Sequence, residues 1–457
     1  MTGFTNQLNA LRGFYNTGAT RSFDFRREQL QLLKASILKH EAALNAALFE
    51  DLHKSKEEVW ITETGMVLSE IAATLKELKD WMEPKSVPTN LINFPGKSFL
   101  YPEPLGVVLI IAPWNYPFQL LFMPLIGAIA AGNCVVLKPS ELAGATEKVM
   151  STIIGETFNP RYILYAPGEG ATVIPELMDA FRYDHVFFTG GTAVGRIIYQ
   201  KAAAQLTPVT LELGGKSPCI VTSNASLKTA AKRIANVKFS NAGQLCISPD
   251  YLLVHTSVKD EFIGLLKETI VQFYGPNPIT SYDFGRIVNH NHFSRLKKLM
   301  ENEVLLHGGE HNEEELFIAP TIIDNPSLNA PVMREEIFGP LLPVIPYTTD
   351  EEARNMMQQH ENPLAFYIFT NNKKEAAQWL QAVPFGGGCV NTTGMHYLNK
   401  HLPFGGRGNS GIGRYHGRYS FETFSHIKSV LRTTAWPDIP LAYPPLKGKL
   451  TTLKKII

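Results

Sequence analysis

The first 82 residues carry apolar positions that recur every three or four residues. The three clearest stripes are Leu8, Leu11 and Tyr15; Leu30, Leu33 and Ile37; and Val67, Ile71, Leu75 and Leu78. This period places each stripe on one face of a helix. We therefore expect residues 1–82 to form helices whose apolar faces pack on a core.

The pattern changes between Lys85 and Leu105, where prolines alternate with β-forming residues. Pro95 and Pro102 lie within or beside the runs NLINF and SFLY. Proline is excluded from the interior of a helix and of a central strand. The segment therefore predicts an extended arm or hairpin, which is a candidate for contact with another subunit.

From Leu105 the rhythm becomes strand, helix, strand, helix. Apolar runs such as LGVVLIIA, NCVVLK and HVFFT are continuous, as expected of strands buried on both faces of a parallel sheet. Helical stretches such as FQLLFMPLIGAIAAG separate them, and a second α/β region begins after residue 246 with YLLVH. The alternation predicts α/β domains with parallel sheets, in which ligands bind beyond the carboxyl ends of the strands.

The charges of the chain nearly cancel, because 43 Lys and Arg face 42 Asp and Glu, a formal net charge of +1. Such a chain has no electrostatic basis for binding nucleic acid or a membrane surface. The N-terminus lacks the pattern of a signal peptide, and the most apolar run, 116–132, contains two prolines and is shorter than the roughly 20 residues of a membrane span. We expect a cytoplasmic protein without a transmembrane anchor.

The four cysteines are scattered, at positions 134, 219, 246 and 389. They show neither the CxxC spacing of a zinc site nor a disulfide framework, which suits a reducing compartment. The paired carboxylates of EEIFGP have no His or Asp cluster beside them. We therefore expect no metal site.

Residues with useful chemistry follow three of the predicted strands. Asn115 lies in a loop stiffened by flanking prolines, where we expect an exposed amide, and Lys138 and Glu141 place a cation and a carboxylate at a second turn. The third loop, TGGTAVG at 189–195, combines glycines that let a phosphate approach the backbone with the start of a helix. This run is not GxGxxG and is weak evidence alone, but three such loops at one sheet edge predict a ligand site.

The strongest candidate for catalysis is Cys246, in the run FSNAGQLCISP. A thiolate is strongly nucleophilic, and the thioester that it forms can be hydrolysed. Glu212, in LELGG, is a lone carboxylate between leucines, where burial raises the pKa toward that of a useful base. Each residue alone also fits a structural role, Cys246 as a small apolar residue and Glu212 as an edge or ion-paired residue. Our hypothesis is that the two segments meet in the fold.

Seven motifs then appear in a fixed order along nearly the whole chain. They are PWNYP, KPSE, FTGGTAVG, TLELGGKSP, NAGQLC, EEIFGP and LPFGGRGNSGIG. In this order they resemble the aldehyde dehydrogenase superfamily, from the N-terminal helices to about residue 430. The wording of TPVTLELGGKSPC and GQLCISPDY is similar to the class 3, fatty-aldehyde-type branch.

The resemblance implies NAD(P)-dependent oxidation of an aldehyde to the carboxylic acid. Cys246 would attack the carbonyl to give a thiohemiacetal, and the Asn115 amide and the Cys246 N–H would stabilise the oxyanion. Oxidation would leave a thioester, which water activated by Glu212 would hydrolyse.

A dinucleotide site is implied as well. Lys138 and Glu141 would hold the adenine-side ribose, and Glu141 would repel a 2′-phosphate, which favours NAD while leaving NADP possible. The other residues implied at the cofactor are Pro113 and Trp114 along the groove, Gly190, Gly191, Thr192 and Gly195 in the pyrophosphate turn, Glu336 at the nicotinamide ribose and Phe338 beside the ring.

The family fold implies a Rossmann-like parallel-sheet cofactor domain, an α/β catalytic domain and a small bridging β-sheet. The expected bounds are 1–85 and 103–213 for the cofactor domain, 214–417 for the catalytic domain, 86–102 and 418–440 for the bridging element and 441–457 for a tail. The bridging element predicts a homodimer.

Three positions depart from the pattern of the family. Arg407 replaces an apolar residue, Leu245 is bulkier than the usual neighbour of the nucleophile, and Gly191 replaces a hydroxyl or amide side chain. Three other functions stay open: an acylating dehydrogenase, against which Glu212 speaks; a Cys–Glu acyl hydrolase that needs no nicotinamide; and a structural, lens-type protein without turnover, against which Cys246 and Asn115 speak.

Overall fold

The computed structural model describes residues 3–436, 438 and 443–455. Its N-terminal region is helical, as the apolar stripes predict. The helices are α1 (Thr5–Asn16), α2 (Phe23–Lys39), α3 (Glu41–Leu52), α4 (Lys56–Val59) and α5 (Gly65–Met82). A π-helical turn, η2 (Trp60–Thr64), joins α4 to α5, and the hydroxyl of Ser55 caps α4 by accepting a hydrogen bond from Glu58 N. The apolar stripes face inward, since Leu8, Leu33 and Ile71 have no solvent exposure.

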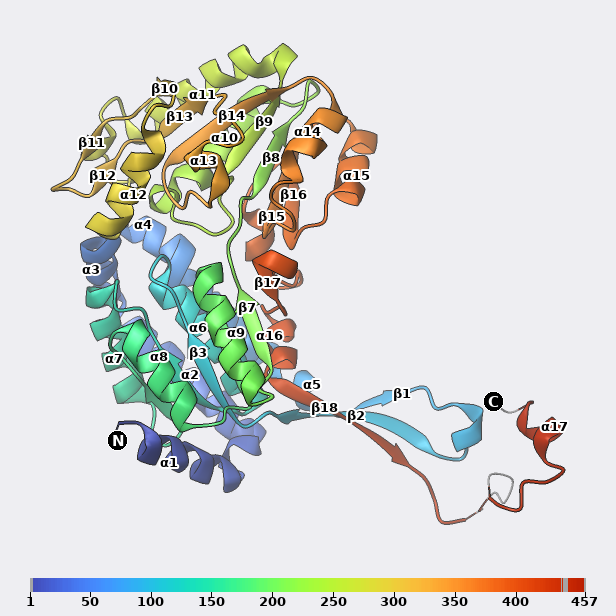
Figure 1. Ribbon diagram of the computed structural model, residues 1–457. Coiled ribbons are helices and arrows are strands. Elements are labelled where there is room, and N and C mark those ends of the chain that lie inside the picture. The colour runs from blue at the N-terminus through green and yellow to red at the C-terminus, as the bar shows by residue number, and fades with distance from the viewer. Residues whose placement is uncertain (1–2, 437, 439–442, 456–457) are drawn as a thin grey trace.

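The first large sheet forms the lower part of the body (Figure 1). Its strands, in spatial order, are β17 (Gly411–Ile412), β7 (Val209–Glu212), β6 (His185–Thr189), β3 (Val107–Ile111), β4 (Cys134–Lys138) and β5 (Ile163–Tyr165). All neighbours are parallel except β17, which is antiparallel to β7. The connecting helices are α6 (Pro117–Ala131), α7 (Gly144–Thr157), α8 (Gly170–Ala180) and α9 (Thr192–Ala204).

The strand order of this sheet reverses between β3 and β6. From β3 the chain first adds β4 and β5 on one side and then returns to add β6 and β7 on the other. Such a switch point leaves a crevice at the carboxyl ends of the strands. The register pairs Ile111 with both Lys138 and Phe188, so the three loops predicted to bind a ligand begin at the same edge.

The second large sheet forms the upper part of the body (Figure 1). Its order is β10 (Leu305–His307), β13 (Thr321–Asp324), β14 (Leu341–Tyr347), β9 (Tyr251–His255), β8 (Pro218–Val221), β15 (Ala365–Phe369) and β16 (Gly387–Val390), all parallel except β10. Its helices are α10 (Leu227–Phe239), α11 (Lys259–Tyr274), α12 (His290–Met300), α13 (Pro331–Arg334), α14 (Asp350–Met357) and α15 (Lys373–Ala382). A two-stranded ribbon, β11 (His311–Asn312) and β12 (Phe317–Ile318), lies at one end.

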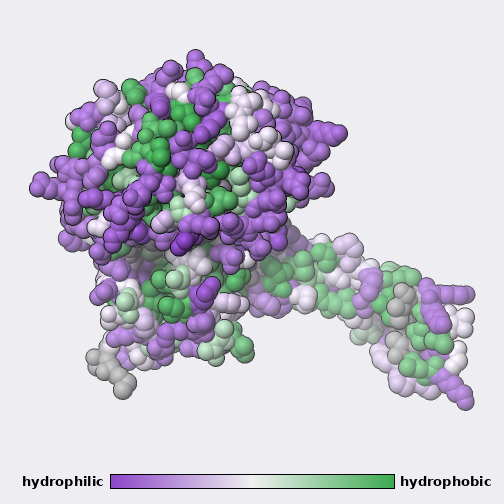
Figure 2. All heavy atoms as spheres, turned by 45° about the horizontal axis from the view of Figure 1, so that its top comes forward, coloured by the Kyte–Doolittle hydropathy of each residue, from purple (hydrophilic) through white to green (hydrophobic). Residues whose placement is uncertain are grey.

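The predicted arm is an antiparallel three-stranded sheet that projects from the body (Figure 1). It consists of β1 (Lys85–Val87), β2 (Lys97–Pro104) and β18 (Ser425–Arg432), and the short helix α16 (Arg418–Thr423) leads into β18. Figure 2 shows hydrophobic side chains along this arm, where Leu91 and Phe94 are each 67% exposed. The tail predicted at 441–457 falls partly outside the described residues, and the described part contains α17 (Leu450–Leu453).

The fold class is therefore α/β with two mainly parallel sheets and a small antiparallel sheet, as the sequence predicts. Two details differ. Helix α8 was not anticipated, because the helix-breaking Pro175 lies in the middle of its short apolar run. Strand β17 joins the first sheet although it lies in the range expected for the second domain. The exact domain bounds stay a prediction. Among the described helices, none combines the length and the apolar character needed to cross a membrane.

Candidate active site

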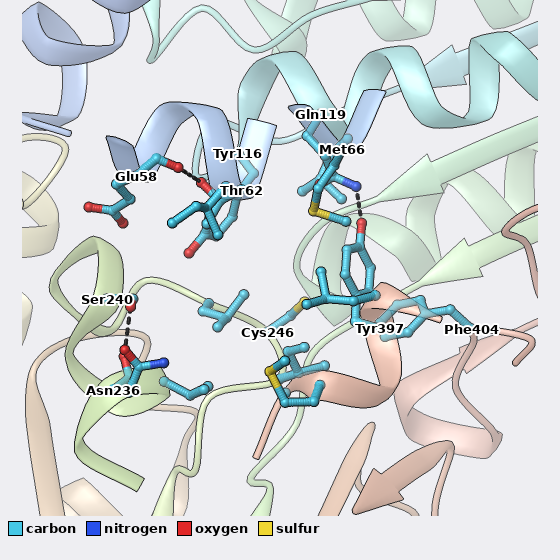
Figure 3. A pocket seen from close by; sticks show the side chains of 18 of the residues that line it. Glu58, Thr62, Met66, Tyr116, Gln119, Asn236, Ser240, Cys246, Tyr397 and Phe404 are labelled. Atoms are coloured by element: carbon cyan, nitrogen blue, oxygen red, sulfur yellow. Dashed lines mark hydrogen bonds between the residues drawn. The ribbon is translucent and has the colours of Figure 1, made fainter. Parts of the chain in front are cut away.

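Cys246 and Glu212 line one cavity of about 580 Å³ between the two large sheets. Glu212 is the last residue of β7, and Cys246 lies in the loop that follows α10. Figure 3 shows the Cys246 side chain in the same space as Tyr397 and Phe404, with Tyr116 across the cavity. The two segments that the sequence analysis singled out therefore meet in the fold.

The loop that carries the thiol has an unusual backbone. The residues before Cys246 include three successive positive φ angles, 49° at Asn241, 50° at Ala242 and 74° at Gly243. A Cβ at Gly243 would overlap the carbonyl oxygen of Gly339, so only glycine fits there. The buried Gln244 side chain closes the loop by donating to Asn241 O at 3.0 Å and to Arg286 O at 2.9 Å. These contacts hold the thiol in one place.

The thiol of Cys246 rests in its neutral form. Burial raises its pKa to about 12, and the carboxylates of Glu336 and Glu212 add to the rise. The N–H groups of Cys246 and Ile247 oppose the rise without cancelling it. A thiol in this form becomes a strong nucleophile only when a base removes its proton.

Glu212 is a buried carboxyl without a compensating partner. Its side chain is 2% exposed, and within the described residues neither carboxyl oxygen has a hydrogen-bond partner. Burial raises the pKa of Glu212 well above its usual value, because a lone charge is costly in an apolar setting. Its backbone is fixed, since Gly190 N donates to Glu212 O at 3.0 Å. This side chain can exchange a proton with a group in the cavity.

The amide of Asn115 is buried, at 2% exposure, which corrects the expectation that it is exposed. The helical segment around α4 and η2 packs over the loop that carries Asn115. Short-range sequence patterns cannot predict such a contact between distant segments. Asn115 Nδ2 donates to Gln244 O at 3.0 Å, which leaves a second N–H on the amide, while Asn115 O accepts from Lys54 Nζ at 2.9 Å and Asn241 Nδ2 at 2.8 Å. The amide is therefore anchored to the loop that carries Cys246, and one of its N–H groups is left without a bond to that loop; Asn115 itself is not among the residues that line the cavity.

Lys138 and Glu141 meet at the end of β4. Lys138 Nζ donates to Glu141 Oε2 at 3.3 Å and to the Pro139 carbonyl, and Glu141 Oε1 accepts from Gly170 N at 3.0 Å. Burial lowers the pKa of Lys138. Burial acts to raise the pKa of Glu141, but its backbone donors and Lys138 together bring it below its usual value. An ionised carboxylate therefore lies beside the start of α8.

The glycine turn brings the start of α9 close to the sheet. A Cβ at Gly190 would lie 2.5 Å from the Phe188 ring, and one at Gly195 would lie 2.6 Å from Leu213 Cδ2. Gly191 differs, since no heavy atom lies within 4 Å of its Cβ position. The first helical residue is Thr192. Free backbone N–H groups therefore face an open space at this sheet edge.

The EEIFGP loop lies near enough to the thiol for the Glu336 carboxylate to raise the pKa of Cys246. A Cβ at Gly214 would overlap the Glu336 carboxyl, so the two segments touch. Burial and the nearby Asp250 raise the pKa of Glu336 to about 8. Phe338 packs edge-on against Trp114 with ring centroids 5.4 Å apart, which places the half-buried Pro113–Trp114 step beside this loop.

Sequence reasoning missed two buried residues near the site. Lys54 and Glu63 form an ion pair with no solvent exposure, at 2.6 Å, and Lys54 contacts the Asn115 loop. Both belong to the N-terminal helical segment, whose apolar stripes indicated only packing. Within the described residues, no group of three or more His, Cys, Asp or Glu side chains could hold a metal ion.

Known proteins resemble this chain over nearly its full length. Residues 9–430 match the aldehyde dehydrogenase family. The 4,4′-diaponeurosporen-aldehyde dehydrogenase of Staphylococcus aureus is 46% identical over 97% of this chain and 96% of its own length. The dimeric NADP-preferring aldehyde dehydrogenase of Rattus norvegicus is 41% identical over 98% of this chain and 99% of its own length.

Solved structures agree with the sequence comparison. The substrate-bound state of Staphylococcus aureus AldH superposes with a TM-score of 0.98 at 45% identity, over 100% of this chain and 99% of that one. A further sequence relative, aldehyde dehydrogenase family 3 member H1 of Arabidopsis thaliana, is 43% identical over 99% of this chain and 94% of its own length. This relative agrees with the class 3 branch that the sequence motifs predict. The chain therefore belongs to the aldehyde dehydrogenase family and is an NAD(P)-dependent aldehyde dehydrogenase.

Proposed function

We propose that this protein oxidises apolar aldehydes to carboxylic acids, with Cys246 as the nucleophile and Glu212 as the base. The observation that carries the proposal is that a neutral thiol and an uncompensated carboxyl line the same cavity. Apolar and aromatic side chains such as Met66, Leu120 and Phe404 line much of the rest. This lining favours medium-chain, long-chain or aromatic aldehydes. The Staphylococcus aureus relative is named for 4,4′-diaponeurosporen-aldehyde.

The residues at the strand ends fit a dinucleotide. The open space over Gly191 and the N–H groups at the start of α9 suit a pyrophosphate, and the Glu141 carboxylate suits a ribose hydroxyl pair. Glu336 and Phe338 would hold the nicotinamide end, alongside the Pro113–Trp114 step. When bound, the oxidised nicotinamide supplies the acceptor for the hydride that the substrate carbon loses. The ionised Glu141 would repel a 2′-phosphate, so we propose NAD as the preferred cofactor and NADP as a weaker one.

Addition of the thiol to the aldehyde needs a base and an oxyanion site. Glu212, in its ionised form, takes the thiol proton while Cys246 Sγ bonds to the carbonyl carbon. The carbonyl oxygen gains the negative charge, and the free N–H of Asn115 and the Cys246 N–H stabilise it. One such donor in a dry site contributes about 3 kcal/mol to the transition state.

Loss of the hydride turns the adduct into a thioester on Cys246. Glu212, after giving up the first proton to solvent, takes a proton from water as the water oxygen attacks the thioester carbonyl. The C–S bond breaks, the acid leaves, and the thiol regains a proton. Because Glu212 lies in the same cavity as Cys246, water is favoured as the acyl acceptor over an added thiol such as coenzyme A.

Two substitutions test the assignment. Cys246→Ala should abolish reduction of the dinucleotide, since no covalent adduct can form. Glu212→Gln should give a burst of reduced dinucleotide at high pH, where the thiolate forms without the carboxylate. Slow turnover should follow, because no base is left to activate the water that hydrolyses the thioester. Cys389→Ala is the control, since this half-buried thiol lies outside the cavity.

Rapid-mixing absorbance would measure the burst, and mass spectrometry of the quenched protein would detect the acyl group on Cys246. A steady-state rate for Glu212→Gln equal to that of the wild type would remove Glu212 from the mechanism. Activity in Cys246→Ala would remove the nucleophile.

The arm supports a further proposal, that the chain forms a homodimer. Apolar side chains on the projecting arm are exposed: Leu91 and Phe94, in the connection between β1 and β2, at 67% each, and Leu431, in β18, at 47%. Exposed apolar surface of this kind is typical of interfaces.

All four cysteines are free thiols, which supports a reducing compartment such as the cytoplasm.

A further inference from the structure

A fully buried ion pair lies beside the oxyanion loop, and no step of the proposed reaction uses it. Lys54 lies in the turn between α3 and α4, and Glu63 lies in η2. Their side chains have no solvent exposure, and Lys54 Nζ lies 2.6 Å from Glu63 Oε1. An apolar pair of similar volume is often as stable as a buried ion pair, so stability alone is a weak reason for these residues.

The contacts of Lys54 point to the PWNYP loop. Its ammonium donates to Asn115 O at 2.9 Å and lies 3.8 Å from the centroid of the Tyr116 ring. Together with Glu63, these groups give the ammonium a carboxylate, a carbonyl and an aromatic face as partners. Two of the three partners are consecutive residues of the loop that carries the oxyanion donor.

Glu63 holds the other end of the same stretch. Its Oε2 accepts from Gln119 N at 2.8 Å, and the Phe118 N–H also acts on this carboxylate. These N–H groups belong to the first turn of α6, whose N-cap residue Tyr116 makes no side-chain capping bond. A carboxylate from elsewhere in the chain thus caps α6, and the pair fixes residues 115–119 at both ends.

The fixed carbonyl determines where the Asn115 side chain points. Asn241 Nδ2 donates to the same oxygen at 2.8 Å, and Asn115 Nδ2 returns a bond to Gln244 O at 3.0 Å. These bonds connect the oxyanion loop to the nucleophile loop. Rotation of the peptide plane at Asn115 would move the amide away from the adduct that forms on Cys246.

We propose that Lys54 is a positioning residue for the oxyanion donor: held by Glu63, it fixes the main chain at Asn115 so that the side-chain amide faces the oxygen of the Cys246 adduct. Neither Lys54 nor Asn115 is among the residues that line the cavity, whereas Tyr116 is. Lys54 therefore acts through the Asn115–Tyr116 stretch that it holds, and the Asn115 amide connects this stretch to the Cys246 loop through its bond to Gln244 O. This inference rests on the proposed role of Asn115.

The first test is Lys54→Met, which keeps the length of the side chain and removes the charge. The single-turnover rate of dinucleotide reduction should fall about ten- to a hundredfold, the loss expected when a reacting group is misplaced by a fraction of an ångström to one ångström. The KM for NAD should change little, because Lys54 contacts Asn115 and Tyr116 and not the Pro113–Trp114 step, Glu141 or the glycine turn. Lys39→Met is the matched control, since it removes an exposed Lys–Glu pair of the same 2.6 Å length.

A second readout separates positioning from general loosening of the fold. Alkylation of Cys246 by iodoacetamide forms no oxyanion, so Lys54→Met should leave its rate unchanged. A parallel loss of alkylation and hydride transfer would mean that the whole nucleophile loop has moved, and would overturn the proposal.

A double-mutant cycle gives the sharpest outcome. In an Asn115→Ala background the oxyanion donor is already absent, so Lys54→Met should cause no further loss of rate. Multiplying losses would show that Lys54 acts by another route and would overturn the inference. If Lys54→Met does not fold, Glu63→Gln replaces it, since glutamine still accepts from Gln119 N but no longer holds the ammonium by charge. The same loss, absent in the Asn115→Ala background, is then expected, and a wild-type rate for Glu63→Gln contradicts the proposal.

The cycle also distinguishes this inference from the proposed function. An inactive Asn115→Ala with a fully active Lys54→Met would remove only the role of Lys54. A fully active Asn115→Ala would instead remove the oxyanion assignment on which both depend.

Discussion

At the scale of single residues, two ionisable groups of the site have pKa values far above their ordinary values. The Cys246 thiol has a pKa of about 12, and the Glu212 carboxyl has a pKa well above its usual value, both mainly because of burial. A buried base with a raised pKa is weakly ionised at neutral pH but is a strong proton acceptor once ionised. Activity should therefore rise with pH through the neutral and mildly alkaline range.

The pH dependence of thiol reactivity is a direct prediction. With a thiol pKa of about 12, the rate of Cys246 alkylation by iodoacetamide should rise about tenfold per pH unit between pH 7 and 10. Glu336→Gln should increase this rate, because the Glu336 charge raises the thiol pKa. The pKa of Glu336 is itself about 8, so the increase should be larger at pH 9, where Glu336 is mostly ionised, than at pH 7.

Glu335→Gln is the control for this prediction, because the neighbouring carboxylate is exposed and pairs with Arg295 at 3.2 Å. Equal alkylation rates for wild type and Glu336→Gln at pH 9 would show that the Glu336 charge does not reach the thiol.

Residue identity could be predicted from sequence more readily than residue environment. Cys246 and Glu212 stand out by type and neighbours, and the structure places them in one cavity. Asn115 also stands out, but its burial depends on a helical segment some fifty to sixty positions earlier in the chain. Lys54 and Glu63 carry no local signal, because a Lys and a Glu in a helical stretch are ordinarily solvated.

At the scale of elements, the helix that follows the glycine turn is placed by its contact with the sheet. Gly195, on α9, packs where any side chain would meet Leu213 and Phe188. This contact brings the N-terminus of α9 to the sheet edge where the dinucleotide is proposed to bind. Glycine in a helix is ordinarily unfavourable, so close packing accounts for it here.

Gly195→Ala should therefore reduce both stability and cofactor binding. Overpacking of this kind costs about 1–3 kcal/mol, and the displaced helix end should raise the KM for NAD. Gly155→Ala is the matched control: it lies in α7 with no heavy atom within 4 Å of its Cβ position, and alanine there should stabilise the fold by about 0.5–1 kcal/mol. Thermal unfolding and the KM for NAD measure both effects. A Gly195→Ala enzyme with unchanged Tm and KM would contradict the packing argument.

The alternation of strands and helices could be predicted because parallel strands buried on both faces read as continuous apolar runs. Helix α8 could not, since Pro175 interrupts the spacing of its three buried residues, Val173, Leu177 and Met178, and its N-terminus has no capping side chain. Pairing of the two-residue strand β17 with β7 could not be predicted either, because two residues give no periodicity.

At the scale of the whole molecule, the exposed apolar side chains of the arm have no partner that the described residues of a single chain would account for. Its three strands project from the body, and β2 meets α5 and α6 where it leaves the body (Figure 1). A small sheet with exposed apolar side chains gains little stability by itself, so a second copy is the proposed cover.

The dimer proposal predicts a sedimenting species of twice the 50.8 kDa chain mass at micromolar concentration. Phe94→Glu, at a position that is 67% exposed on the arm, should shift the protein toward monomer. Val304→Glu, at 62% exposure on the body, should leave the mass unchanged. A wild-type protein that sediments as a monomer would end the proposal.

The sequence by itself determined the family, most of the order of helices and strands, and the residues that are proposed as nucleophile and base, because each of these depends on local residue type and spacing. Only the tertiary structure decided which of these groups is buried, which is paired and which faces the cavity. Burial and pairing depend on segments that are distant in sequence, such as the helical turn that carries Lys54 and Glu63 over the Asn115 loop. Those contacts set the pKa values and the positions on which the chemistry depends.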